Sequence, residues 1–297
     1  MGSRLRALVR LLAYAALTLP AMPVQAFAVA FGLPLRKSLP QWYHRRCCRI
    51  LGFRVERRGR RSRAHPTLYA CNHVSYFDIM ILGSLIPASF VAKAEVGRWP
   101  FFGWLARLQQ TVFVARRGRE AGSHLDELRA RLEAGDDLIL FPEGTSSDGN
   151  RVLPFKSTLF AAAEKPVRGQ PLCVQPVSIA YTRLDGVPMG RYLRPFFAWF
   201  GDMELAGHLW HAVGLGRATV LVEFHKAVTV AEFGSRKALS AHCETAVSRG
   251  LANALAGRRP ERAKAAKATK PAEQIEGGAQ AARPAGAALE KTRMSQA

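Results

Sequence analysis

Apolar residues in this chain follow two patterns: one long run near the start, then short runs that alternate with amphipathic segments. The short continuous runs predict strands buried on both faces, because such strands lack a polar alternation. We predict strands within 51–63 and over 67–72, 88–94, 111–116, 137–144, 173–181 and 219–228. The segments between them carry apolar residues at helical spacing or long apolar faces. They predict helices over 74–86, 99–109, 120–134, 155–165 and 235–257.

This alternation predicts the fold class. Strands that alternate with helices are typical of α/β proteins, in which helices cover both faces of a sheet. We therefore expect a mixed, largely parallel sheet flanked by helices over residues 41–257. Residues 258–297 lack aromatic side chains and are rich in Ala, Lys, Arg and Pro. Such a segment buries too little apolar surface to order itself, so we expect a disordered basic tail.

The first apolar run is long enough to cross a membrane. Residues 11–35 contain no charged side chain, and about 20 apolar residues suffice for a span. Pro20 and Pro23 interrupt the middle, so we do not expect one straight helix. Basic residues flank both ends, which favours the cytoplasmic side for both. We therefore expect residues 1–40 to form a membrane-associated helical hairpin, with the rest of the protein on the cytoplasmic face of the inner membrane.

Two alternatives to this membrane interpretation have to be weighed. Val24-Gln25-Ala26 resembles a signal-peptide cleavage site, but a strongly basic flank follows at once. The net charge of +21 indicates a polyanionic partner, which is either nucleic acid or an anionic membrane surface. Because the basic residues flank the apolar run and fill the tail, and no nucleic-acid-binding motif is present, we expect a membrane surface and no nucleic acid. Five Cys without ligand spacing predict neither disulfides nor a metal site.

Residues that could carry chemistry gather at the ends of predicted strands. Residues 71–80 read CNHVSYFDIM, so His73 follows a buried strand and Asp78 lies in the first turn of the next helix. In open α/β sheets, sites collect at the carboxyl ends of strands. An Asp that accepts the Nδ1 proton of a His leaves Nε2 free as a base, which suits deprotonation of a substrate hydroxyl. Helix capping is the competing explanation for this pair taken alone.

Two further strand ends strengthen the catalytic interpretation. The buried strand at 137–144 leads into FPEGTSS at 141–147, which places Glu143 at a strand end. The strand at 111–116 ends in Arg116 and Arg117, and the forked guanidinium group suits a phosphate. Either feature alone is compatible with ordinary surface charge. The ends of three strands therefore carry His/Asp, Arg and Glu/Gly/Thr, and this combination favours one catalytic site.

These motifs stand in the order of a known family. Asn72, His73 and Asp78 match an Asn-His-four residues-Asp block, and QTVFVAR at 110–116 resembles Gly-x-Ile-Phe-Ile-x-Arg. FPEGTSS resembles Phe-Pro-Glu-Gly-Thr-Arg-Ser, and VQPVSIAY at 174–181 supplies a Pro within an apolar strand. From about residue 40 to 257, the sequence therefore resembles the glycerolipid acyltransferases, the family that includes 1-acylglycerol-3-phosphate acyltransferases.

The resemblance implies an O-acyltransferase that moves a fatty acyl group from acyl-CoA or acyl carrier protein to a lysolipid hydroxyl, with no bound cofactor and no metal. The implied acceptor is 1-acyl-sn-glycerol 3-phosphate, acylated at its sn-2 hydroxyl to give phosphatidic acid in phospholipid biosynthesis. The helix over 99–109 would line an acyl groove, contact lipid or belong to the core. The implied catalytic residues are His73 and Asp78, and the implied substrate-binding residues are Asn72, Arg116, Glu143, Gly144 and Thr145.

Two departures from the family pattern bear on the acceptor. Gln110 replaces the usual Gly, and Ser146 replaces an Arg that helps with the acceptor's phosphate. In addition, RPFFAWFGDMELAGHLW at 194–210 resembles bacterial members that include lyso-ornithine lipid acyltransferases. Lyso-ornithine lipid is therefore the alternative acceptor. A serine hydrolase is the competing enzyme class, and the sequence lacks its G-x-S-x-G elbow.

Overall fold

The computed structural model describes residues 2–114 and 120–258. Arg116, Arg117 and the predicted tail beyond Arg258 lie outside these ranges. The strands are β1 (Phe53–Arg58), β2 (Thr67–Cys71), β3 (Ser89–Lys93), β4 (Val112–Val114), β5 (Leu138–Leu140), β6 (Cys173–Leu184), β7 (Val187–Pro188) and β8 (Ala218–Phe224). The helices are α1 (Arg4–Ala30), α2 (Leu35–Leu51), α3 (Phe77–Leu85), α4 (Phe102–Leu108), α5 (Glu120–Glu133), α6 (Leu205–Gly214) and α7 (Arg236–Leu255). Short 3₁₀ helices are η1 (Ala94–Arg98), η2 (Ser157–Ala163), η3 (Arg194–Phe196) and η4 (Val230–Glu232).

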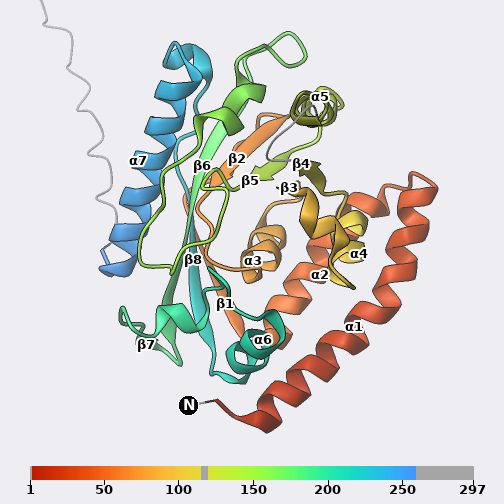
Figure 1. The fold of residues 1–297 in the computed structure, drawn as a ribbon, viewed down its shortest axis with the longest axis vertical. Coiled ribbons are helices and arrows are strands. Elements are labelled where there is room, and N and C mark those ends of the chain that lie inside the picture. Colours follow the sequence, from red (N-terminus) through yellow and green to blue (C-terminus); the bar gives the residue numbers. More distant parts are fainter. Residues whose placement is uncertain (1, 115–119, 259–297) are drawn as a thin grey trace, which may run out of the picture. The chain divides into compact units, whose positions relative to one another are not determined.

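The described strands form one sheet in the order β1-β8-β6-β2-β5-β3-β4, and β7 pairs with β6 (Figure 1). The neighbours from β6 to β4 run parallel, as do β1 and β8, whereas β6 and β8 run antiparallel. The predicted mixed, largely parallel sheet is thus confirmed. Strands β2 and β5 are in register from Leu68–Leu138 to Ala70–Leu140, so their carboxyl ends lie next to each other.

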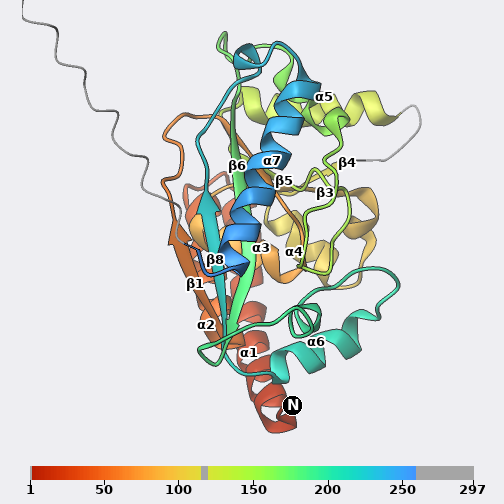
Figure 2. The same cartoon turned by 90° about the vertical axis from the view of Figure 1, so that its left-hand side faces the viewer.

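Helices cover both faces of the sheet, and strand β2 shows how the sequence requires this. All five of its residues are buried, and alternate residues of a strand point to opposite faces. Tyr69 and Cys71 pack in a cluster with residues of α2 and α3, while Leu68 and Ala70 pack with residues of α5 and α7. Figures 1 and 2 show α7 against β6 on one face and α2 and α3 on the other.

The first two helices form an antiparallel pair beside the sheet (Figure 1). Helix α1 runs without interruption through Pro20 and Pro23, so the expected break at these prolines is wrong. Each proline removes one backbone donor, yet the remaining hydrogen bonds and the packing against α2 keep the segment helical. The chain turns at residues 31–34 instead, where Gly32 has a φ of 64°. Helix α1 is long and apolar enough to cross a membrane, and it is largely unburied.

Helix α2 was not predicted, although its sequence carries a readable period. His44, Cys47, Cys48 and Leu51 are buried and lie at the i, i+3, i+4, i+7 spacing of a helix face. Gly52 then ends the helix with a φ of 86°, as a left-handed C-cap does. The many Arg residues of the segment hid this pattern, because they occupy the opposite face. The predicted helix over 155–165 is only the short 3₁₀ helix η2.

Candidate functional site

The site begins where β2 ends. His73 follows the strand by two residues, and the Nδ1 atom of its ring lies 2.8 Å from Oδ2 of Asp78 in the first turn of α3. The Asp78 side chain is fully buried, whereas 21% of the His73 side chain remains exposed. The structure therefore brings the two predicted catalytic residues together. Helix α3 starts only at Phe77, and the irregular turn before it lets the carboxylate reach back to the ring.

The Asp78 carboxylate is held by more than the histidine. The same Oδ2 atom accepts the backbone N–H groups of Val74 at 2.7 Å and Ser75 at 2.9 Å. The hydroxyl of Tyr181, on the neighbouring strand β6, donates to Oδ1 at 2.9 Å. Burial raises the pKa of Tyr181, so this phenol stays a donor. These donors fix the orientation of the carboxylate, which holds the Nδ1–H tautomer of His73.

The His73 ring is packed on one face and partly exposed. Its ring stacks on Phe141 with the centroids 4.1 Å apart and the planes inclined by 22°. Among the described residues, none makes a hydrogen bond to Nε2. A neutral imidazole that donates from Nδ1 carries its lone pair on Nε2. The arrangement can therefore accept a proton from a group that approaches the exposed edge.

Glu143 follows β5 and connects the end of this strand with the end of β2. Its Oε1 accepts the backbone N–H of His73 at 3.0 Å, and its Oε2 accepts that of Leu153 at 3.2 Å. Burial raises the pKa of Glu143 to about 8, against the pull of these two donors. The backbone N–H of Ser147 in turn donates to the carbonyl of His73 at 2.9 Å. Glu143 thus positions the His73 peptide from within the fold, and contact with substrate stays a prediction.

Asn72 also acts inside the fold. Its side chain is fully buried, its Nδ2 donates to the carbonyl of Ile179 at 3.0 Å, and its Oδ1 accepts the N–H of the same residue at 2.8 Å. The amide group therefore continues the β2–β6 pairing by one step beyond the strand. This contact fixes the chain just before His73. The predicted contact of Asn72 with substrate stays a prediction.

The turn at 141–147 lies beside the base. Gly144 has a φ of 66°, a conformation that L-residues with side chains adopt at a cost, and Thr145 is exposed. Ser146, where the family pattern has Arg, donates its hydroxyl to the carbonyl of Trp199. Arg116, the predicted phosphate ligand, lies outside the described residues. The assignment of Gly144, Thr145 and Arg116 to substrate binding stays a prediction.

A second segment near the base was missed by sequence reasoning. The backbone N–H of Trp199 donates to the carbonyl of Val74 at 3.0 Å, next to His73. Arg194 on η3 donates to Oδ1 of Asn150 at 2.5 Å, and its buried Nε has no partner among the described residues. Burial lowers the pKa of Arg194. Segments 146–150 and 194–199 therefore hold the partly buried guanidinium of Arg194 against Asn150, and no spacing rule within the sequence indicated this contact.

Gln110 illustrates why the family pattern has Gly at this position. Its φ is 57°, in the left-handed region where Gly is favoured. The residue closes the turn between α4 and β4, with its N–H bonded to the carbonyl of Arg107 at 2.9 Å. Gln110 thus adopts the backbone conformation that the Gly of the family pattern favours.

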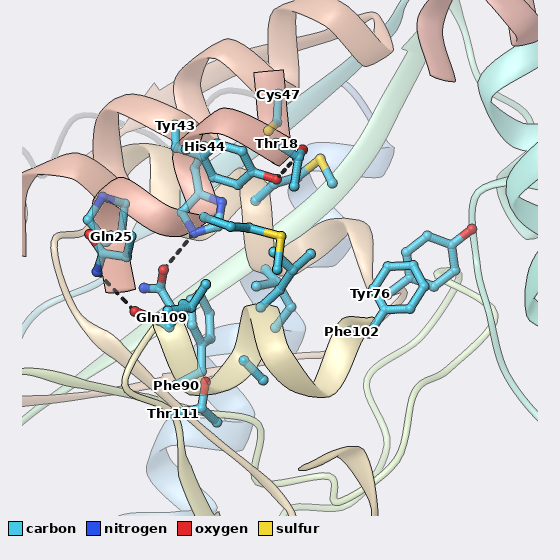
Figure 3. A pocket seen from close by; sticks show the side chains of 18 of the residues that line it. Thr18, Gln25, Tyr43, His44, Cys47, Tyr76, Phe90, Phe102, Gln109 and Thr111 are labelled. Atoms are coloured by element: carbon cyan, nitrogen blue, oxygen red, sulfur yellow. Dashed lines mark hydrogen bonds between the residues drawn. The ribbon is translucent and has the colours of Figure 1, made fainter. Parts of the chain in front are cut away.

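An apolar cavity of about 210 Å³ lies between the helix pair α1–α2 and the elements α3, β3 and α4 (Figure 3). Tyr76, three residues after His73, lies at one side of it. Phe102, Leu105 and Leu108 of α4 line the wall, whereas Trp104 of the same helix is exposed. One face of the predicted 99–109 helix thus lines a groove. Among the described residues, no group of His, Cys, Asp or Glu could hold a metal ion.

Comparison with known proteins places these features in context. Residues 52–180 match the model of the Acyltransferase family. The chain is 44% identical over 250 residues to a lyso-ornithine lipid O-acyltransferase of Brucella abortus, which covers 83% of this chain and 94% of that protein. It is 42% identical over 247 residues to a protein of the same description from Rhizobium meliloti, with 82% of this chain and 85% of the relative covered.

Proteins of a second description are also similar. The chain is 32% identical over 192 residues to a 1-acyl-sn-glycerol-3-phosphate acyltransferase of Neisseria gonorrhoeae, covering 64% of this chain and 71% of that one. The crystal structure of the 1-acyl-sn-glycerophosphate (LPA) acyltransferase of Thermotoga maritima superimposes with a TM-score of 0.56 at 24% identity. The match covers 84% of this chain and 99% of that structure, and at this identity it supports the fold.

Proposed function

The chain belongs to the acyltransferase family and is an O-acyltransferase, and from this premise we propose that its acceptor is a lyso-ornithine lipid. The acyl donor in this proposal is a thioester of coenzyme A or acyl carrier protein. One observation carries the chemistry: the Asp78 carboxylate holds the Nδ1 edge of His73, while Nε2 has no hydrogen-bond partner among the described residues.

The geometry supports a direct transfer with His73 as base. Nε2 takes the proton of the acceptor hydroxyl, and the oxygen attacks the thioester carbonyl, which forms the C–O bond of the ester. Asp78 stabilises the imidazolium that results. Collapse of the tetrahedral intermediate breaks the C–S bond, and the imidazolium returns the proton to the leaving thiolate. The catalytic residues in this proposal are His73 and Asp78.

Three observations favour a lyso-ornithine acceptor. The relatives with 42–44% identity over most of the chain are described as lyso-ornithine lipid O-acyltransferases. Ser146 stands where the family's phosphate-binding Arg is expected, and its hydroxyl is bonded within the fold. The partly buried guanidinium of Arg194 suits a carboxylate of the acceptor, because its planar donors match that group. Our earlier expectation of 1-acyl-sn-glycerol 3-phosphate becomes the second candidate, supported by the Neisseria relative.

The helix pair supports a location at the membrane. Helix α1 is long and apolar enough to span a bilayer, and large apolar side chains such as Leu12, Leu19 and Phe27 are exposed on it. We expect the chain at the inner membrane with the active site on the cytoplasmic face. Fractionation of cells that express the full chain tests this, and recovery in the soluble fraction would contradict it.

An acyl-transfer assay tests the enzymatic proposal. Purified full-length protein receives palmitoyl-CoA or palmitoyl-acyl carrier protein, with lyso-ornithine lipid and 1-acyl-sn-glycerol 3-phosphate offered in parallel. We expect faster transfer to lyso-ornithine lipid and a loss of transfer in His73→Ala. His211→Ala, a change at an exposed histidine of α6, is the matched control and should retain the activity. Near-normal transfer by His73→Ala would refute the mechanism, and preference for the phosphate lipid would refute the acceptor.

A further inference from the structure

Arg194 lies across Gly149 from the chain that carries the base. The position that a Cβ atom on Gly149 would take is 3.9 Å from Cβ of Arg194 and 3.1 Å from Cγ1 of Val74, the neighbour of His73. Further along the same segment, the backbone N–H of Trp199 donates to the carbonyl of Val74 at 3.0 Å. The segment that carries Arg194 is therefore fixed against the turn that carries His73.

One hydrogen bond holds the Arg194 guanidinium. Its Nη1 donates to Oδ1 of Asn150 at 2.5 Å. The Nδ2 atom of Asn150 donates in turn to Oδ2 of Asp148 at 3.1 Å and to the carbonyl of Arg191 at 3.2 Å. Asn150 thus lies between Arg194 and Asp148, and Arg194 forms no ion pair with a described residue.

The second terminal nitrogen of Arg194 is available to a ligand. Within the described residues, Nη2 makes no hydrogen bond, and it is not enclosed as the buried Nε atom is. The side chain is partly buried, and this burial lowers the pKa of Arg194. A guanidinium that loses water without gaining an anionic partner is unfavourable, so the position favours a ligand with a negative charge.

The charge around this nitrogen is positive. Asp148 is the described acid whose charge acts on Arg194. Burial would raise the pKa of Asp148, but the hydrogen bonds from Asn150 lower it, and the charges of Arg151 and Arg191 lower it further. Among the described residues, one carboxylate therefore lies among three guanidinium groups. Such a field attracts a carboxylate and repels an ammonium group.

We propose that Arg194 binds the carboxylate of the acceptor's amino-acid head group, and that this carboxylate, rather than the side-chain ammonium, is the charge that the enzyme selects. The inference rests on the proposed lyso-ornithine acceptor. In an N-acylated ornithine both groups stay charged, and the planar donors of a guanidinium match the carboxylate. Arg194 is then a substrate-binding residue, while His73 and Asp78 keep the catalytic roles.

Two analogues of the acceptor test which charge is selected. Lyso-ornithine lipid is compared by kcat/KM with its carboxamide, which lacks the negative charge, and with its Nδ-acetyl derivative, which lacks the positive charge. The full-length enzyme receives palmitoyl-CoA or palmitoyl-acyl carrier protein, whichever supports transfer. We expect the carboxamide to be poorer than the parent lipid by at least about tenfold, because its neutral head group leaves the guanidinium without an anion. The acetylated lipid should lose less.

Variants assign the preference to Arg194. Arg194→Met keeps an apolar stem but removes the donors, so the ratio of parent lipid to carboxamide should fall toward one, mainly through the KM of the parent lipid. Arg194→Lys keeps the charge without the planar fork and should retain part of the ratio. Arg183→Met, a change of an exposed arginine on β6, is the control and should leave the ratio unchanged. If Arg194→Met lowers transfer to both lipids equally, Arg194 only supports Asn150 and the inference is wrong.

The outcomes separate this inference from the proposed function. The comparison of lipids in the unaltered enzyme needs no variant, so it decides the question even where a variant does not fold. Equal use of the parent lipid and its carboxamide, or a loss with the acetylated lipid as large as with the carboxamide, overturns this inference alone. Transfer to 1-acyl-sn-glycerol 3-phosphate but to none of the three ornithine lipids overturns the proposed acceptor. Absence of transfer to every acceptor overturns the proposed function.

Discussion

Removing the hydrogen bond from Tyr181 to Asp78 tests whether Tyr181 only positions the catalytic base or also takes part in the reaction. Tyr181→Phe removes one hydroxyl and keeps the ring, which stacks on Phe197 with centroids 5.8 Å apart. Oδ1 of Asp78 loses a donor at 2.9 Å. Oδ2 keeps His73 Nδ1 and two backbone N–H groups.

The expected magnitudes follow from this division. A hydrogen bond to a charged group contributes about 1.5–3 kcal/mol, and its loss leaves a buried carboxylate oxygen short of a donor. For a domain of this size, that corresponds to a melting temperature lower by roughly 3–12 °C. The bond to His73 persists, so we expect kcat to fall by no more than about tenfold, or about 1.4 kcal/mol in the barrier.

Asp78→Asn is the matched comparison. Asn removes the negative charge that stabilises the imidazolium, while its carbonyl oxygen stays toward Nδ1 of His73, because the N–H groups of Val74 and Ser75 donate to the same position. We therefore expect kcat to fall by more than about tenfold, that is, by more than in Tyr181→Phe. Both variants are purified in detergent, melted under identical conditions and assayed with palmitoyl-CoA.

Two results would refute this reasoning. If Tyr181→Phe loses as much activity as Asp78→Asn while it melts normally, Tyr181 takes part in the reaction rather than in positioning. If Tyr181→Phe melts at the temperature of the unaltered protein, the hydroxyl does not stabilise the buried carboxylate.

Three further outcomes follow from single side chains. Glu143→Gln puts an NH₂ group against a backbone N–H, so we expect a loss of about 1–3 kcal/mol in detergent melts above the Glu143 pKa of about 8, where the carboxylate is the state compared; unchanged melting under that condition contradicts its role as a double acceptor. The folded-state pKa of His44 lies at about 4, below its ordinary 6.5. The contribution of the neutral His44 ring to the free energy of unfolding is therefore complete above pH 6.5. It falls as the pH drops toward 4, and about 2 kcal/mol is lost at pH 5. In His44→Phe the free energy of unfolding should depend less on pH between 6.5 and 4. An equal pH dependence in both proteins refutes this expectation. Arg10→Ala removes donors to the carbonyls of Val213 and Leu215, so we expect faster proteolysis of α1 than in the exposed control Arg6→Ala; equal rates contradict the anchoring.

Local signals predicted the framework of this molecule well. Continuous apolar runs located the buried strands, since a strand such as β2 is enclosed on both faces. The His73–Asp78 contact was also predictable, because the two residues lie five positions apart across a strand end. Strand ends and short turns are local, and their geometry depends on few residues.

Contacts between distant parts of the chain were not predictable in this way. Tyr181 lies 103 positions from Asp78, and Asn72 lies 107 positions from Ile179. Their roles depend on the order of β6 and β2 in the sheet, which no single segment encodes. The hydrogen bonds of Gln25 with Leu108 and of His44 with Gln109 likewise form only when α1 and α2 pack against α4.

Helix α1 is fastened to the rest of the protein at two separated places. Near its start, the N–H of Ser3 donates to the carbonyl of Gly214 at 2.9 Å, and Arg10 donates to the carbonyls of Val213 and Leu215. Near its end, Gln25 donates to the carbonyl of Leu108. A helix of 27 residues is about 40 Å long. Attachment near both ends prevents it from rotating away from the rest of the protein about either end. We therefore expect a chain that enters the cavity behind it to be threaded lengthwise, and a bulky or branched tail to be excluded.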